Sequence, residues 1–302
     1  MDNRFKIAGG KCVIPEGTTE IPESAFECCK DLVEIDIPDS VTTIGAFAFA
    51  ECSNLRSVRI PRSVVEIGNG AFFYCTGMKE VDIPASVGCI PDQAFGGCSG
   101  LKSVVIPDGI ESIGHSAFYG CSRLTAVSIP ESVREIGHFA FCKDTALTSV
   151  NVDADNPTYR SVSNCCLTKN GRTLVFGCST SVIPAGVERI EDFAFYGCTR
   201  LKSVTLPEGV RTIGEWAFCG CDRLREINIP SSVREVEPYA LGTSVSDIHV
   251  SAKSPEDCSD LTYAVKGLPL KKIVLHVPDG SGYAFRNHPF FKRFDFICED
   301  TH

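Results

Sequence analysis

Hydrophobic and polar positions follow a pattern that returns every 23 residues along most of the chain. In LRSVRIP (residues 55–61), apolar residues alternate with arginine and serine, which is typical of a short strand buried on one face. Proline ends this strand, because its ring has no N–H for a ladder hydrogen bond. The segments SVVEIG (63–68) and GAFFYC (70–75) then return apolar side chains to the core. Each period therefore predicts one coil with a strand, two corners and a compact return segment.

A fixed short period is the sequence signature of a solenoid. We expect an α/β repeat solenoid with 23-residue repeats, in which parallel strands stack about 4.8 Å apart on one face. Gly68 is expected to adopt a positive φ at a corner of its coil. An alanine-phenylalanine pair recurs in register, with its phenylalanines at Phe26, Phe49, Phe72, Phe95, Phe118, Phe141, Phe195 and Phe218.

The breaks in the period predict how the chain is organised. We expect a single elongated domain over residues 1–302. It comprises a first run of repeats (9–146), a strand plus hairpin insertion (147–177), a second run of repeats (178–246), and a degenerate coil with a C-terminal cap (247–302).

The insertion and the cap each carry a local signal. Asn170-Gly171 between two strand-like segments predicts a hairpin in which both turn residues have positive φ, and we expect this hairpin to jut from the stack. Near the C-terminus, Ser281 is expected to cap a short helix. Five phenylalanines are expected to form a lid over the last coil: Phe285, Phe290, Phe291, Phe294 and Phe296.

The repeat phrase resembles a known family. The pattern L-x-x-V-x-I-P-x-S-V-x-x-I-G-x-x-A-F-x-x-C, written out by residues 55–75, resembles the BspA-like, or Treponema-type, class of leucine-rich repeats. Residues 155–176 resemble a hairpin insertion common in that class, and residues 277–294 resemble its C-terminal cap. The resemblance implies a right-handed, all-parallel solenoid used for binding, often at cell surfaces, without shared catalytic chemistry.

Composition and charge narrow the partners. The net charge of −9 and the pI near 5.2 oppose binding to nucleic acid, which needs a basic surface. No apolar run approaches the ~18 residues of a membrane span, and we expect a monomer. The family resemblance suggests a cell-surface or secreted protein, whereas a native start at Met1, with no visible signal peptide, suggests the cytoplasm.

The seventeen cysteines are expected to be free thiols that fill the core. Side chains of one column lie about 4.8 Å apart, whereas disulfide Cβ atoms lie about 3.8 Å apart. A buried thiol instead suits a position that faces a carbonyl of the preceding coil. The column in question contains Cys29, Cys52, Cys75, Cys98, Cys121, Cys198 and Cys221. This many thiols favours a reducing compartment.

Two groups of variable positions are candidate partner-binding surfaces. Phe193, Trp216 and Tyr239 fall in one column of consecutive coils, with Tyr196 nearby, and would anchor a protein or glycan if exposed. The alternative is a partly buried ladder that packs one corner of the solenoid. The second group is basic and would attract an acidic partner, unless its members are simply solvated side chains. It contains Arg200, Lys202, Arg223 and Arg225.

The sequence offers little support for chemistry at a metal or catalytic site. Asp92, His115 and His138 fall in one column, but parallel side chains on a surface do not converge on an ion, so we expect no metal. No phosphate-binding loop, nucleophile elbow or zinc-protease motif is present, and we expect no cofactor. The sequence therefore favours a non-catalytic binding scaffold for a protein or glycan, with a structural spacer as the alternative and an enzyme as the least supported class.

Overall fold

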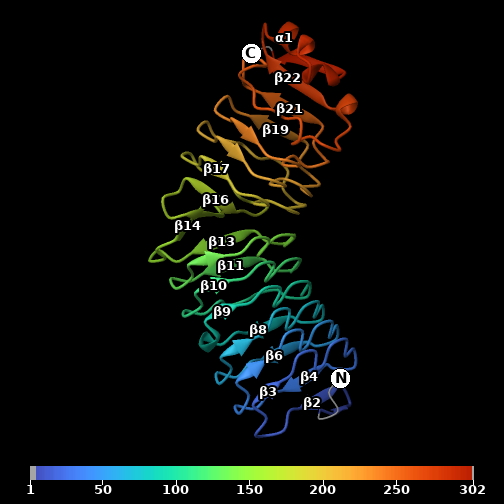
Figure 1. Cartoon of the computed structure of the whole chain (residues 1–302), viewed down its shortest axis with the longest axis vertical. Coiled ribbons are helices and arrows are strands. Elements are labelled where there is room, and N and C mark those ends of the chain that lie inside the picture. The colour runs from blue at the N-terminus through green and yellow to red at the C-terminus, as the bar shows by residue number, and fades with distance from the viewer. Residues whose placement is uncertain (1–4, 301–302) are drawn as a thin grey trace. The chain divides into compact units, whose positions relative to one another are not determined.

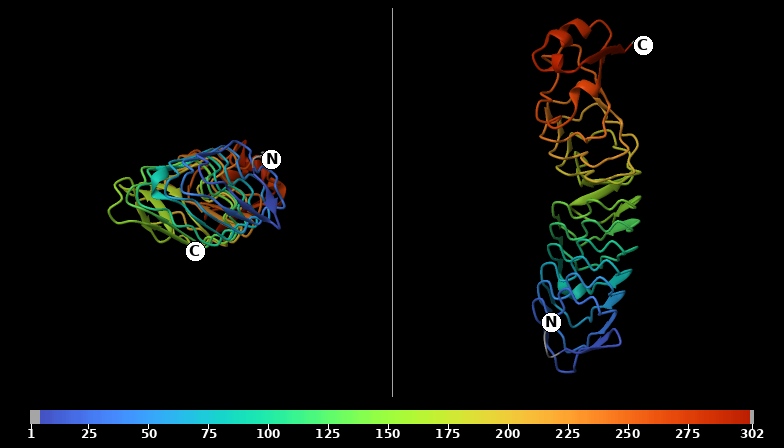
Figure 2. Two further views of the ribbon diagram at one scale, coloured as in Figure 1. Left: turned by 90° about the horizontal axis from the view of Figure 1, so that it is seen from below. Right: turned by 90° about the vertical axis from the view of Figure 1, so that its right-hand side faces the viewer.

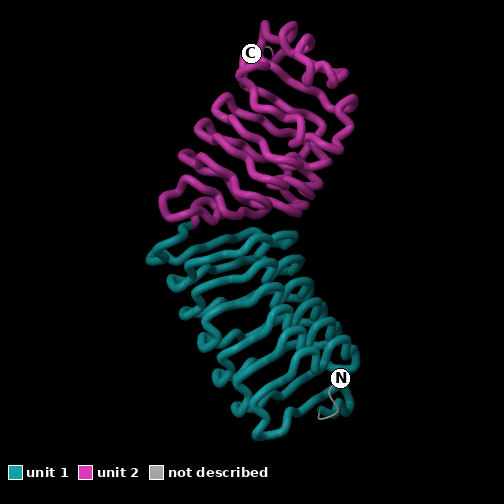
Figure 3. Tube along the Cα trace, viewed as in Figure 1, with its two compact units in different colours: residues 1–160 teal, residues 161–302 magenta. Residues whose placement is uncertain are grey.

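The computed structural model describes residues 5–300, so Met1, on which the cytoplasmic alternative depends, lies outside the described residues. The chain divides into two compact units, residues 1–160 and 161–302 (Figure 3). Within each unit, successive coils of chain stack on one another with their strands in parallel (Figures 1 and 2). The predicted solenoid with its period of about 23 residues is confirmed. Helix is scarce: residues 5–300 contain one six-residue α-helix and three 3₁₀ turns.

The strands of the first unit lie in two rows, because most coils carry a second, two-residue strand that the sequence analysis missed. The register pairs Thr43 with Glu66 in one row and Val58 with Val81 in the other. The strands are β1 (Ile7–Ala8), β2 (Lys11–Val13), β3 (Glu20–Ile21), β4 (Glu34–Asp36), β5 (Thr43–Ile44), β6 (Ser57–Arg59), β7 (Glu66–Ile67), β8 (Glu80–Asp82), β9 (Cys89–Ile90), β10 (Ser112–Ile113), β11 (Ala126–Ile129), β12 (Glu135–Ile136) and β13 (Ser149–Val152), with a 3₁₀ turn η1 (Ala85–Val87). Hydrogen bonds divide the described strands of these rows into five sheets, in which all pairs are parallel except β1 with β2.

The second unit contains two larger sheets. One has the strand order β14 (Tyr159–Val162), β15 (Cys165–Thr168), β16 (Thr173–Phe176), β17 (Arg189–Ile190), β18 (Thr212–Ile213), β20 (Glu235–Val236). The other has the order β19 (Glu226–Ile229), β21 (Asp247–Val250), β22 (Val274–Pro278), β23 (Phe296–Asp300). Short helical segments complete the unit: η2 (Leu270–Lys272), α1 (Gly282–Asn287) and η3 (Phe291–Arg293).

The phenylalanine column forms a ring stack inside the coils of each unit. The rings of Phe26 and Phe49 lie 5.1 Å apart with an interplanar angle of 6°, and Phe195 and Phe218 repeat this geometry at 5.3 Å. Both pairs are fully buried. Because each coil adds one ring to the stack, any coil that lost its phenylalanine would leave a cavity against two neighbours.

The predicted hydrogen bonds of the cysteine column are confirmed at six of its seven positions, including Cys198, whose thiol donates to the Gly177 carbonyl at 3.9 Å. The Cys52 thiol donates to the Phe26 carbonyl at 3.0 Å, and the same bond recurs one coil later from Cys75 to Phe49. Three further thiols, of Cys98, Cys121 and Cys221, make the equivalent bond at 3.1–3.3 Å. Burial raises the pKa of Cys98 to about 12, so this thiol stays protonated and unreactive.

Glycine follows β7 and several other two-residue strands, where it is needed for close packing, so the prediction of a positive φ at Gly68 is wrong. The positive φ lies two residues later, at Gly70 with φ +61°. A Cβ on Gly68 would lie 2.3 Å from the backbone nitrogen of Ala46 in the preceding coil. Glycine at position 68 therefore lets the backbones of two successive coils approach each other, and the positive φ of the corner is at Gly70.

The hairpin is confirmed, but it does not jut from the stack. β15 and β16 pair antiparallel, and β16 then pairs in parallel with β17 as part of the sheet. Its side chains Cys165, Leu167 and Leu174 belong to the core of the second unit. Of the two turn residues, Gly171 alone has a positive φ, because the Asn170 side chain accepts hydrogen bonds from Arg172 N–H and the Thr168 hydroxyl.

The C-terminal cap is present with two corrections. The Ser281 hydroxyl does not cap α1; it donates to the Pro278 carbonyl, and the Glu299 carboxylate accepts the N–H of Gly282 instead. Phe285, Phe291 and Phe294 are buried and Phe290 packs against them, as expected of a lid. Phe296 is 55% exposed, because it occupies an outward position of strand β23.

Candidate functional site

The structure brings the four predicted aromatic residues together at one corner of the second unit. We call Phe193, Tyr196, Trp216 and Tyr239 the aromatic corner. Phe193, Trp216 and Tyr239 all adopt a positive φ of 56–61°, and the N–H of each donates to a carbonyl of the next coil. A positive φ is uncommon for large side chains. This conformation turns the backbone tightly and places an aromatic side chain at the same point of each coil.

The rings of the aromatic corner contact one another in sequence. Trp216 and Tyr239 stack with centroids 4.6 Å apart and an angle of 23°. The Tyr196 ring packs edge to face against the rings of Trp216 and Phe193, with centroids 6.4 Å and 6.0 Å apart. All four residues are half-buried. The aromatic corner is therefore both a packed ladder and a partly exposed surface, because its rings contact one another and also present apolar area to solvent.

Charged groups border the aromatic corner. The Trp216 indole N–H donates to the Glu215 carboxylate at 2.9 Å, which fixes the orientation of the ring. The Lys266 ammonium lies 5.6 Å from the centre of the Tyr239 ring, within range of a cation–π interaction. A half-buried apolar centre with a polar rim is the arrangement found in protein interfaces.

The four basic residues are exposed, and no ion pair joins any of them to another described residue. Arg225 donates from its guanidinium to the Ser244 carbonyl at 3.0 Å, so its side chain is partly held. Two acidic residues, Asp222 and Glu226, flank Arg223 and Arg225 in the sequence and are also exposed. A patch of positive charge for an acidic partner therefore stays a prediction. The residues concerned are Arg200, Lys202, Arg223 and Arg225.

The column of Asp92, His115 and His138 serves hydrogen bonds between coils. The Asp92 carboxylate accepts the backbone N–H of His115 at 2.7 Å, and the Nδ1 of His115 accepts the backbone N–H of His138 at 3.1 Å. The two imidazole rings stack at 5.5 Å. Because the acceptor atoms are used by the backbone, this column has a structural role, and it recurs in the second unit where Asp192 accepts the N–H of Glu215.

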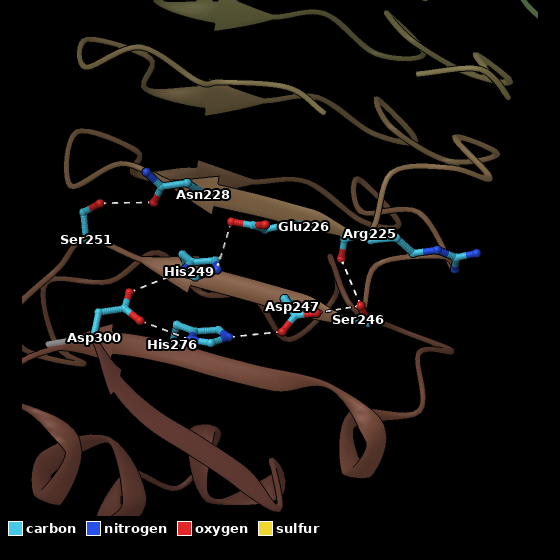
Figure 4. A network of polar contacts seen from close by, with 9 residues as sticks. All are labelled: Arg225, Glu226, Asn228, Ser246, Asp247, His249, Ser251, His276 and Asp300. Carbon is cyan, nitrogen blue, oxygen red and sulfur yellow. Dashed lines mark hydrogen bonds and ion pairs between the residues drawn. The ribbon is translucent and has the colours of Figure 1, made fainter. Parts of the chain in front are cut away.

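A second cluster, which the sequence analysis missed, lies on the outward face of β19, β21, β22 and β23 (Figure 4). We call Glu226, Asp247, His249, His276 and Asp300 the histidine–carboxylate network. The rings of His249 and His276 stack at 4.0 Å with an angle of 9°, because parallel register places the two residues directly opposite each other. Hydrogen bonds from Ser246 and His276 lower the pKa of Asp247.

The missed network had a weak sequence signal. DIHV (247–250) and VLHVP (274–278) both alternate polar and apolar residues, and each places a histidine at an outward position. These segments are 27 residues apart, so a search for columns at intervals of 23 does not align them. The pairing became visible only with the strand register of the degenerate C-terminal coils.

Comparisons with known proteins agree with this fold. The family model described as "BspA type Leucine rich repeat region" matches the chain in 6 copies, over residues 10–99, 66–170 and 175–290. A search of the curated proteins finds no match. None of the helices formed by residues 5–300 has the length and hydrophobicity that a membrane crossing requires.

Three solved structures illustrate the likeness. A leucine-rich repeat protein from Eubacterium ventriosum is 23% identical, with a TM-score of 0.69, and the match covers 89% of this chain and 73% of that one. A leucine rich cell surface protein from Faecalibacterium prausnitzii is 22% identical, with a TM-score of 0.60 and coverage of 100% and 94%. The pneumococcal vaccine antigen PcpA is 18% identical, with a TM-score of 0.57 and coverage of 97% and 80%. At these identities the likeness concerns the fold.

Proposed function

The chain belongs to the BspA-type leucine-rich repeat family, and on this premise we propose that it is a non-catalytic binding scaffold that presents its solenoid surface to a protein or glycan. In such repeats the interior is rebuilt in each coil, so specificity falls to the outward positions that vary from coil to coil. The stacked phenylalanines and most of the thiols of the cysteine column are buried and occupy the interior of the coils.

The aromatic corner carries this proposal. Its half-buried rings come from consecutive coils, lie in mutual contact and are bordered by Glu215 and Lys266. Tryptophan and tyrosine dominate binding energy at protein interfaces, and aromatic faces also stack on sugar rings. We propose that Trp216 and Tyr239 are the central anchors and that Phe193 and Tyr196 flank them.

The basic residues and the location extend the proposal. Arg200, Lys202, Arg223 and Arg225 would steer an acidic partner toward the second unit, because exposed charges act on association rates more than on final affinity. The Faecalibacterium prausnitzii relative is described as a cell surface protein. We propose a bacterial cell-surface location for this chain as well, and action as a monomer.

Loss of the two central anchors tests the proposal. We expect wild-type protein to bind defined members of an array of purified glycans and extracellular proteins. Trp216→Ala with Tyr239→Ala should weaken that binding by about 30-fold or more, the range expected when two anchor residues are truncated.

A matched control comes from the first unit. Phe47 and Phe139 share the column of Trp216, with positive φ and half-burial, so their double alanine variant carries the same structural change. Binding by this control should equal that of wild type. Equal losses in both variants would contradict the aromatic corner as the site, and a wild-type protein that binds nothing on the array would favour the structural spacer.

A further inference from the structure

Four further basic residues lie in the C-terminal cap, outside the group predicted from the sequence. Lys271 and Lys272 belong to η2, and Lys292 and Arg293 belong to η3. All four are exposed, and none of them forms an ion pair with a residue of the range 5–300. The Arg293 guanidinium lies 5.6 Å from the centre of the Phe290 ring, a contact that uses the face of the guanidinium and leaves its N–H groups available.

The strand register places these four residues at one edge of a sheet. Strands β19, β21, β22 and β23 are parallel, and their first residues lie opposite one another in this order. The segment η2 ends two residues before the start of β22, and η3 ends three residues before the start of β23. Because the starting ends of parallel strands meet at the same edge, η2 and η3 lie next to each other on successive coils.

The basic residues predicted from the sequence continue along this edge. Arg223 and Arg225 come directly before β19, and Arg200 and Lys202 hold the same positions 23 residues earlier. Figure 4 shows the Arg225 side chain extending away from the sheet at the end where β19 begins. We call these four residues, together with the four of η2 and η3, the basic stripe.

Positive charge exceeds negative charge along the basic stripe. Four acidic residues adjoin it in the sequence or the sheet: Asp222, Glu226, Asp247 and Asp295. Of these, Asp247 accepts the Ser246 hydroxyl at 2.6 Å and lies 3.1 Å from His276 Nε2, so its carboxylate faces these partners. Eight cations therefore stand beside four carboxylates, which makes the stripe a positive area on a chain with a net charge of −9.

We propose that the basic stripe binds a linear acidic polysaccharide, in which carboxylate or sulfate groups recur along the chain. Lysine and arginine donate charge-assisted hydrogen bonds to such oxyanions, and arginine can do so with two N–H groups at once. Steps of about 4.8 Å between coils give the stripe a length of about 20 Å and a repeat similar to that of the sugar units. The proposal rests on the proposed function, because it names a partner class for the same binding scaffold.

The charge pattern favours a polysaccharide over other polyanions. Duplex DNA carries about one negative charge per 1.7 Å of its axis, and the acidic residues within the stripe would repel so dense a charge. A membrane surface attracts a broad basic face, whereas these cations follow a single edge. A linear chain with about one anion per sugar unit can instead place its anions at the cations and its neutral groups at the carboxylates.

The test is a titration of fluorescently labelled oligosaccharides with the full chain, followed by fluorescence anisotropy. Three octasaccharides are compared: a heparin fragment with sulfate groups, an oligogalacturonate with carboxylates alone, and neutral maltooctaose. We expect at least one of the acidic octasaccharides to bind saturably and maltooctaose not to bind. The affinity should fall between about 50 mM and 200 mM salt, because binding releases counterions.

Two charge-neutralising variants locate the contact. Lys271→Gln, Lys272→Gln and Lys292→Gln together should weaken binding about tenfold. The plot of log affinity against log salt concentration should also become less steep by about one unit. We expect the same effect from Arg200→Gln, Lys202→Gln and Arg223→Gln together, because both halves of the stripe contact one polysaccharide chain.

The matched control neutralises three exposed cations elsewhere in the second unit. Arg211→Gln, Arg234→Gln and Lys253→Gln make the same change in net charge, and the two arginines precede strands of the other sheet. This control should bind the acidic octasaccharide as wild type does. Trp216→Ala with Tyr239→Ala retains all eight cations and should keep the salt dependence, so failure of the aromatic corner and failure of the stripe give different results.

Three outcomes would overturn the proposal: no binding of either acidic octasaccharide, equal losses in the test and control variants, or a loss confined to the variant at residues 200–223. The last result would show that η2 and η3 take no part in binding. A short DNA duplex that binds more tightly than both acidic octasaccharides would refute a polysaccharide as the partner.

Discussion

At the scale of single residues, the most informative deviation from the repeat is Asp144. It follows Cys121 by 23 residues and so occupies the place of a thiol in the cysteine column. Its side chain is 5% exposed, and neither carboxyl oxygen has a hydrogen-bond partner among the described residues. Burial raises the pKa of Asp144 well above its usual value, so the group is held in its protonated form.

Asp144→Cys should therefore stabilise the protein. A thiol at this position can donate to the preceding coil as Cys121 does, and an unsatisfied buried polar group costs about 1–3 kcal/mol. The pKa of Asp144 is higher in the folded than in the unfolded protein, so the proton on this group stabilises the folded state. This contribution to the free energy of unfolding is complete below about pH 4. That contribution is lost as the pH rises toward the folded pKa.

Urea unfolding at pH 4 and pH 7 measures both effects. The gain from Asp144→Cys should be larger at pH 7, where the unfolded wild type is ionised. Asp144→Asn cannot ionise either. Relative to wild type, its free energy of unfolding should therefore also increase between pH 4 and pH 7. A gain that is equal at both pH values would contradict a buried, protonated carboxyl.

Asn156 shows what the insertion sequence requires at residue level. It is fully buried, donates from its amide to the carbonyls of Pro130 and Val133, and accepts the N–H groups of Thr158 and Tyr159. All of its hydrogen-bonding groups are thus used to fix the turn that follows the last coil of the first unit. The resemblance of residues 155–176 to a family insertion located this segment, but only coordinates show which side chain holds it.

At the scale of the coil, two neighbouring glycines have different roles, and substitution separates them. Gly68→Ala should cost more than about 2 kcal/mol, because the new Cβ would meet backbone atoms of Gly45 and Ala46 that cannot move aside. Gly70→Asn should cost less than about 1 kcal/mol. The nearest atoms there belong to the Phe47 side chain, and asparagine tolerates a positive φ.

Thermal unfolding of the two variants, followed by circular dichroism, provides the comparison. Gln93 and Ser116 already occupy the Gly70 position in later coils with φ of 58° and 54°. A larger loss of Tm in Gly70→Asn than in Gly68→Ala would contradict these roles.

Most features of the coil could be predicted from the repeat, whereas the positions that depart from the repeat could not. Identical spacing of leucine, valine, proline and phenylalanine indicates identical environments, so the strand, the phenylalanine stack and the thiol bonds followed from the pattern. The pattern cannot tell whether glycine is required for its φ or for its missing Cβ, which is why Gly68 was misassigned. Likewise, Asn170-Gly171 predicted the hairpin, but not that β16 would continue the sheet.

The aromatic corner and the histidine–carboxylate network also differ in how far the repeat predicts them. Phe193, Trp216 and Tyr239 share a column of the repeat, so their proximity was predictable, whereas their degree of burial was not. His249, His276 and Asp300 lie where coil lengths depart from the period, and their contacts depend on a register that only the folded sheet defines.

At the scale of the whole molecule, the division into domains stays a prediction. The structure has two compact units, whereas the sequence predicts a single domain over residues 1–302. Cooperative unfolding can decide, because Asp144 lies in the first unit and the chain's single tryptophan, Trp216, lies in the second. In a single cooperative domain, the stabilisation by Asp144→Cys should appear in full in the urea unfolding curve of Trp216 fluorescence.

Circular dichroism of the same samples measures how far Asp144→Cys shifts the urea unfolding of the whole chain, and the Trp216 curve is compared with this shift. A Trp216 curve that does not move, while the circular dichroism curve shows a separate stabilised transition, would show that the two units unfold independently. The single-domain prediction would then be wrong.

The central claim is that the aromatic corner is the surface with which this scaffold binds its partner, and Trp216 reports on it directly. The measurement is a fluorescence titration of the wild-type protein with a ligand identified on the array. Since Trp216 is the sole tryptophan, its emission should change and saturate with the same Kd as binding itself. Saturable binding that leaves the emission of Trp216 unchanged would contradict the claim and place the binding surface elsewhere on the chain.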